Sequence, residues 1–80
     1  MAIFDPAIYN GNPGAYTFLK EAYDLDHEKT DKAFNRMMDN GIIGSQLYII
    51  WNDCCDRNTA WALNVIAENS IEDIKTHIND

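Results

Sequence analysis

The chain has little positive charge and no long apolar run, and both absences exclude whole classes of protein. Its 6 Lys and Arg residues face 13 Asp and Glu residues in 80 positions, which gives a formal net charge of −7. Binding to nucleic-acid backbone or to an anionic membrane normally needs a cationic excess, so neither is an expected partner. The longest uninterrupted apolar run, residues 47–51, is far shorter than the ~20 residues of a membrane span. No secretion signal is visible either, and we expect a cytoplasmic protein.

The cysteines are few, and their placement disfavours a disulfide or a metal site. Cys54 and Cys55 are neighbours, and adjacent Cα atoms lie only about 3.8 Å apart, below the usual span of a disulfide. A zinc site needs four ligands at loop spacing, but His27 and His77 lie far from the pair. We therefore expect buried, reduced thiols and no metal or other cofactor, with a metal or redox role as the less favoured alternative.

Apolar residues recur at helical spacing along most of the chain, which predicts a single all-α domain over residues 1–80. An irregular arm over residues 1–12 precedes the helices, and we expect its apolar side chains to dock on the helical body. The expected helices cover residues 13–25, 26–39, 45–55, 58–68 and 70–78. The expected helix caps are Asn12 followed by Pro13, Asp26, Asp56 or Asn58, and Ser70. The apolar side chains of the arm are Ile3, Phe4, Ile8 and Tyr9.

Residues 45–55 are the most ambiguous segment. Residues 47–51 have the composition of a strand. Leu47, Ile50, Trp51 and Cys54, however, fall at i, i+3, i+4 and i+7, which favours a helix. Because this helix is apolar on most faces, we expect a compact bundle of about five short helices with this one at its centre. Such a small core is marginally stable alone, so a homo-oligomer is expected. The expected core includes Phe18, Phe34, Trp51, Trp61 and the isoleucines.

Five carboxylates gather at the expected junction of the first two helices. They do not match a calcium loop, because Lys29 and Asn35 stand where glycine and glutamate are required. One interpretation is a solvated junction whose charges complement the helix dipoles. The other is an anionic surface that meets a cationic groove on a partner protein. The five residues are Glu21, Asp24, Asp26, Glu28 and Asp31.

Two further polar clusters suit either an anionic ligand or a structural role. Lys29, Lys32 and Arg36 share one helical face, where they can bind a phosphate or be compensated by neighbouring carboxylates. In the second cluster, Asp53 and Arg57 have the spacing of an ion pair along a helix. Alternatively, Arg57 binds a planar anion in a polar pocket at a helix end. The second cluster consists of Asn52, Asp53, Asp56, Arg57 and Asn58.

The most distinctive stretch of the chain begins at Gly41 and ends at Arg57. It reads Gly-Ile-Ile-Gly-Ser and, after Gln46, Leu-Tyr-Ile-Ile-Trp-Asn-Asp-Cys-Cys-Asp-Arg. This block resembles a segment of small phage-encoded proteins of unassigned function, and the resemblance covers residues 41–78. It implies an accessory protein in the host cell, where many such products block host defences by binding rather than by catalysis.

The sequence therefore predicts a small acidic binding protein and not an enzyme, since no histidine stands beside a nucleophile. The leading hypothesis is an anti-CRISPR-like inhibitor that binds a basic surface of a host defence protein stoichiometrically. One alternative is an oligomeric sponge for a nucleotide-type signal, bound where the two polar clusters converge. Another alternative is a small structural or assembly component.

Overall fold

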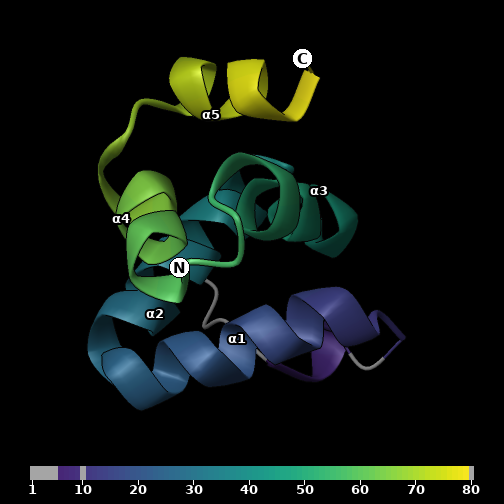
Figure 1. The fold of residues 1–80 in the computed structure, drawn as a ribbon, viewed down its shortest axis with the longest axis vertical. Coiled ribbons are helices and arrows are strands. Elements are labelled where there is room, and N and C mark those ends of the chain that lie inside the picture. The colour runs from purple at the N-terminus through teal and green to yellow at the C-terminus, as the bar shows by residue number, and fades with distance from the viewer. Residues whose placement is uncertain (1–5, 10, 80) are drawn as a thin grey trace.

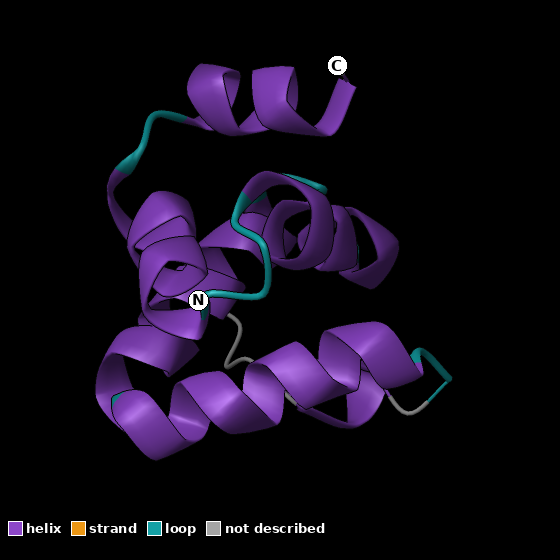
Figure 2. Ribbon diagram, in the orientation of Figure 1, coloured by secondary structure: helices purple, strands orange, loops and turns teal. Residues whose placement is uncertain are grey.

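The computed structural model describes residues 6–9 and 11–79, which form helices joined by short loops, with no strand in this part of the chain (Figures 1 and 2). The predicted all-α fold is confirmed. The elements are a 3₁₀ turn η1 (Pro6–Tyr9), α1 (Pro13–Leu25), α2 (His27–Asp39), α3 (Gly44–Ile49), a π-helical segment η2 (Ile50–Cys54), α4 (Thr59–Glu68) and α5 (Ile71–Asn79).

The helices begin where local capping chemistry predicts. In four of them, a side-chain oxygen of the preceding residue accepts a hydrogen bond from the peptide N–H three positions later, which satisfies a donor that the first turn leaves open. Helix α2 ends at Asp39 and is followed by Asn40 and by Gly41, which adopts a φ of 73°. The four caps are Asn12 to Ala15 at 3.3 Å, Asp26 to Lys29 at 3.0 Å, Asn58 to Trp61 at 3.1 Å and Ser70 to Asp73 at 3.2 Å.

The ambiguous segment is helical, as predicted, but it changes pitch halfway. Gln46 accepts a hydrogen bond from the N–H of Ile43 at 2.7 Å and so opens α3. From Ile50 the turns widen, and the N–H of Cys55 donates to the carbonyl oxygen of Ile50 at 2.9 Å, a spacing of five residues. Such π-turns are rare, and they shift every side chain that follows around the helix axis.

The arm is more regular than predicted, because residues 6–9 make one turn of 3₁₀ helix. Tyr9 is buried, and its ring lies edge-on to Phe34 with the centroids 6.0 Å apart, so docking of the arm is confirmed for this residue. Docking of Ile3, Phe4 and the side chain of Ile8 falls outside what the structure describes.

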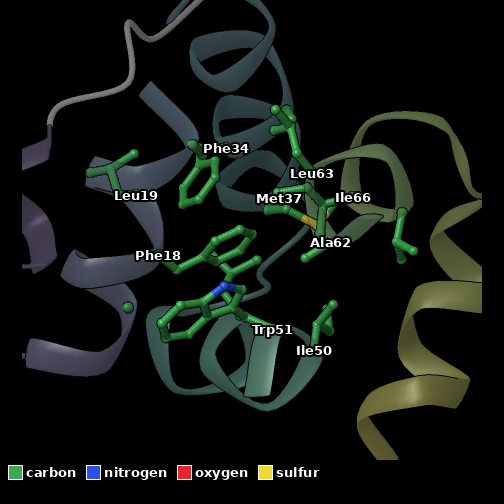
Figure 3. Close-up of a cluster of buried hydrophobic side chains, with 14 of the residues drawn as sticks. Phe18, Leu19, Phe34, Met37, Ile50, Trp51, Ala62, Leu63 and Ile66 are labelled. Atoms are coloured by element: carbon green, nitrogen blue, oxygen red, sulfur yellow. The ribbon is translucent and has the colours of Figure 1, made fainter. Parts of the chain in front are cut away.

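The core is built around a row of aromatic rings that contact one another (Figure 3). The Phe18 ring lies 5.2 Å from that of Phe34 and stacks on Trp51 at 5.7 Å. Helix α1 packs against α2, α3 and α4, whereas α5 packs on η2 at one end of the molecule (Figure 1). The 44–54 segment therefore shares the centre of the bundle with α1 and exposes one polar side at Asp53.

Two residues expected in the core from the sequence are exposed, namely Trp61 and Ile43, and Ile43 is 62% exposed just before α3. Trp61 is 53% exposed, whereas Phe18, Phe34 and Trp51 are buried as predicted. Helix α4 has apolar side chains on more than one face, and α1 and α2 cover only part of it. Smaller side chains fill the covered side, which leaves the indole of Trp61 outside. The buried residues of α4 are Ala62, Leu63, Val65 and Ile66.

The described helices are short. None of them combines the length and the apolarity that crossing a membrane requires. The longest, α1 and α2, have 13 residues each, and both carry charged side chains.

Candidate functional site

Three of the five carboxylates at the junction of α1 and α2 are used by the fold itself. Asp26 is the cap of α2, and Glu28 pairs with Lys32 at 3.2 Å along the same helix. Asp31 accepts a hydrogen bond of 2.6 Å from the hydroxyl of Tyr23 and lies 3.3 Å from His27 Nδ1. These three carboxylates therefore fit the structural interpretation, because each has an intramolecular role.

Glu21 and Asp24 differ from the other three. Both are exposed, and in the described chain no hydrogen bond or ion pair reaches either carboxylate. They line an open hollow of about 390 Å³ together with Leu25, Thr59 and Ala60. The hollow lies at the amino-terminal end of α4, whose dipole favours negative charge there. This end of α1 thus presents two carboxylates that contacts within the fold leave available.

Two large apolar side chains are exposed on α1 and α4, and one of them, Leu25, lines the same hollow as these carboxylates. Leu25 is 56% exposed at the end of α1, and Trp61 is 53% exposed on α4, next to Ala60 in the chain. Trp61 also borders a second hollow of about 310 Å³, which includes Val65 and His77. Hereafter the Trp61 surface means Glu21, Asp24, Leu25, Ala60 and Trp61. Leu25 and Ala60 share the hollow with both carboxylates, whereas Trp61 is linked to it through its chain neighbour Ala60 and lines the second hollow.

The predicted cationic face on α2 is largely engaged. Arg36 donates from Nη1 to the carbonyl oxygen of Ile66 at 2.9 Å and from Nη2 to that of Asn69 at 2.6 Å. Lys29 donates to the side-chain oxygen of Asn64. The hollow of about 420 Å³ along this face is also lined by carboxylates, namely those of Asp26, Glu28 and Glu68. The sequence offered Arg36 as a ligand-binding group, but the structure uses it to close the end of α4.

The predicted ion pair between Asp53 and Arg57 is absent from the ion pairs of the described residues. The helix ends at Cys54, and Asp56 and Arg57 then adopt φ values of 51° and 59°. This left-handed turn carries the guanidinium away from Asp53 and over the ring of Trp51, 5.3 Å from its centroid. Asn58 serves as the cap of α4.

Arg57 has neutral partners instead. Its Nε donates to the side-chain oxygen of Asn52 at 2.7 Å, and its Nη2 lies 3.4 Å from the hydroxyl of Tyr48. The amide of Asn52 in turn donates to Asp53 at 2.7 Å. These contacts lie along 48–57, whereas the cationic face of α2 contacts the far end of α4. Within one chain, the described contacts therefore do not join the two predicted ligand clusters into one site.

The sequence reasoning missed the exposed residues Leu25 and Trp61. A signal for Trp61 was present, because the residues three and seven positions after it, Asn64 and Glu68, are both polar. That pattern is typical of a solvent-facing stripe. Leu25 stands at the end of its helix beside Asp24, where the helical spacing no longer fixes a buried position.

The two thiols differ in environment. Cys55 is buried, and burial, with a further contribution from the neighbouring Cys54, raises the pKa of its thiol. Cys54 is half-buried and lies 3.4 Å from the carbonyl oxygen of His77. Among the described residues, no three His, Cys, Asp or Glu side chains are grouped closely enough to hold a metal ion.

Comparisons with protein-family models, with curated proteins and with solved structures found no match to this chain. The resemblance to phage-encoded proteins therefore stays a prediction.

Proposed function

We propose that this protein is a non-catalytic binding protein that presents the Trp61 surface to a partner protein with a basic surface. Two observations carry the proposal. Leu25 is exposed in the same hollow as Glu21 and Asp24, whose carboxylates have no partner in the described chain, and Trp61, which follows Ala60 of that hollow in the chain, is exposed as well. Tryptophan is enriched among the residues that dominate binding energy at protein interfaces. Carboxylates around such an anchor steer a cationic partner and fix its orientation.

The charge of this surface favours a foreign partner over a second copy of the same chain. Self-association through the Trp61 surface would place Glu21 and Asp24 against their own copies, and like charges brought together cost binding energy. A cationic partner neutralises both carboxylates while it covers the indole. A standard interface buries about 800 Å² on each partner, which is roughly a sixth of the 4713 Å² surface of the described residues.

Inhibition of a host defence protein is the biological role that this binding mode suits best. Support for it comes from the resemblance of residues 41–78 to phage-encoded proteins, from the net charge of −7 and from the small size. A small acidic domain can occupy a cationic groove on an effector and exclude its normal ligand. The nucleotide-sponge alternative is less favoured, because Lys29 and Arg36 are engaged with α4. Self-association through another face stays a prediction, which light scattering on the pure protein measures.

The test must avoid carboxylates that the fold needs. Reversing Asp26, Glu28 or Asp31 would disturb a helix cap or a pair, so the informative variants are Glu21→Lys with Asp24→Lys, and Trp61→Ala. A matched control is Asp39→Lys with Glu72→Lys, which changes the net charge equally at exposed sites elsewhere. Each protein is immobilised and used to capture partners from a lysate of the bacterial host, at low and at high salt.

We expect one protein to be captured by the wild type and by the control, and to be lost from both test variants. Capture should also weaken as salt rises, because exposed charges are screened. Equal capture by all four proteins, or no protein enriched by the wild type, would overturn the proposal. Circular dichroism of each variant confirms that it is folded before capture is compared.

A further inference from the structure

The turn after η2 has an unusual backbone. Asp56 and Arg57 are consecutive residues with φ values of 51° and 59°, although neither is glycine. Left-handed conformations at such residues cost free energy and persist only where surrounding contacts enforce them. Here the N–H of Arg57 donates to the carbonyl oxygen of Trp51 at 2.6 Å, and the N–H of Asn58 to that of Cys55 at 2.8 Å. These two hydrogen bonds to residues before the turn hold it in one conformation.

This backbone fixes the position of the Arg57 guanidinium. The group lies over the Trp51 ring and donates one hydrogen bond to Asn52, with a second, longer contact from Nη2 to Tyr48. A guanidinium has five N–H donors. Both donors of Nη1 and one of Nη2 have no partner in the described chain. The edge formed by these two nitrogens has the geometry that binds a carboxylate through two parallel hydrogen bonds.

Arg57 also makes no ion pair with a carboxylate of the described chain. The protein has 13 carboxylate side chains and 6 Lys and Arg residues, yet no ion pair of the described residues includes Arg57. Asp53 instead accepts a hydrogen bond from the side-chain amide of Asn52. Ordering a long side chain costs conformational entropy, and this arginine is ordered against neutral groups that do not balance its charge.

We infer that Arg57, oriented by Trp51, Asn52 and Tyr48, is a binding site for a single carboxylate group. A carboxylate fits better than a phosphate, because Asp53 and Asp56 flank the turn and repel a dianion more strongly than a monoanion. The carboxylate belongs to an acidic side chain or to a chain terminus of a partner molecule. The site shares no residue with the Trp61 surface. The inference is therefore independent of the function proposed above.

The test is a nuclear magnetic resonance titration with sodium acetate, at an ionic strength held constant with sodium chloride. The Trp61→Phe background leaves Trp51 as the only indole, and the signals followed are Trp51 Nε1–H and Arg57 Nε–H. Inorganic phosphate is titrated in parallel. Arg57→Lys keeps the charge but loses the planar fork, and Lys75→Gln removes an exposed cation elsewhere as a control.

We expect a saturable acetate shift confined to residues 48–58, with a smaller response to phosphate. Arg57→Lys should weaken acetate binding about tenfold, as judged from the Trp51 signal, whereas Lys75→Gln should leave it unchanged. The inference is overturned by a linear or absent acetate shift at these residues, or by an equal response in Arg57→Lys. If Arg57→Lys fails to fold, saturable acetate binding at residues 48–58 of the parent, stronger than phosphate binding, decides the question.

Discussion

Arg36 and Asn69 are 33 positions apart in the chain, yet Nη2 of Arg36 donates to the carbonyl oxygen of Asn69 at 2.6 Å. The same guanidinium donates from Nη1 to the carbonyl oxygen of Ile66 at 2.9 Å. The last carbonyl groups of a helix have no hydrogen-bond partner within it. A cation that binds two of them at the end of α4 supplies the missing donors and interacts favourably with the negative end of the helix dipole. A side chain of α2 thereby caps the carboxyl-terminal end of α4.

We expect Arg36→Met to destabilise the protein by about 2 kcal/mol, because it leaves two partly buried carbonyl oxygens without their charged donor. The melting temperature should fall by roughly 10 °C in a domain of this size. Lys32→Met is the matched control on the same helix, since Lys32 makes only an exposed pair with Glu28. Thermal unfolding followed by circular dichroism measures both variants, and equal effects would remove the structural role assigned to Arg36.

Gly14 allows α1 to approach α3 closely. A Cβ at this position would lie 2.3 Å from Cδ1 of Tyr48, so the ring must shift to admit it. Gly14→Ala should destabilise the protein by about 1 kcal/mol, since overpacking outweighs the gain in helix propensity. Gly11→Ala should change little, because no atom lies within 4 Å of a Cβ there.

Urea unfolding compares these glycine variants. A double variant with Tyr48→Leu should lose most of the Gly14→Ala penalty, because the clash is with the tyrosine ring. If the penalty persists without that ring, its source is the backbone and not the contact with Tyr48.

Tyr9 should make stability fall at alkaline pH. Burial raises the pKa of its hydroxyl from 10.0 to about 12. Between those two values the unfolded chain has lost a proton that the folded chain retains, so the free energy of unfolding falls as pH rises. A difference of two pKa units corresponds to about 3 kcal/mol in the free energy of unfolding. This contribution is present in full below pH 10 and is lost as the pH approaches 12.

Urea unfolding at a series of pH values tests this linkage. Tyr9→Phe keeps the ring but has no proton to lose, so its stability should decline less steeply over the same range. Parallel pH profiles for the wild type and Tyr9→Phe would show that Tyr9 does not control the alkaline limit.

The adjacent thiols should react at very different rates. Cys54 is half-buried, whereas Cys55 is 1% exposed and has a raised pKa, so its reactive thiolate is scarce. A chromogenic disulfide reagent should therefore modify one thiol quickly in the folded protein and the second only on unfolding. Cys54→Ser should abolish the fast phase, and a fast phase that survives in this variant would contradict the assignment.

Local sequence was enough to place the helices of this protein. The cap oxygens act on N–H groups three residues away, and the apolar spacing repeats within each helix, so nearby residues carry both signals. The π-turn escaped prediction because the difference between helical pitches at Ile50–Cys54 depends on packing against α1, α4 and α5.

The candidate sites were predicted less completely. The acidic cluster was visible in the sequence, but only the structure separates Glu21 and Asp24 from the carboxylates that the fold uses. The expected Asp53–Arg57 pair assumed a continuous helix, and it failed because the backbone turns left-handed at Asp56.

The sequence by itself determined an acidic, all-α domain and where its helices start, because those properties follow from composition and from contacts a few residues long. Only the tertiary structure decided that Trp61 faces solvent, that Arg36 closes α4 and that Arg57 lies over Trp51. Each of these outcomes depends on which helix faces are covered or on how the chain turns between helices, and periodicity within a single helix does not encode either.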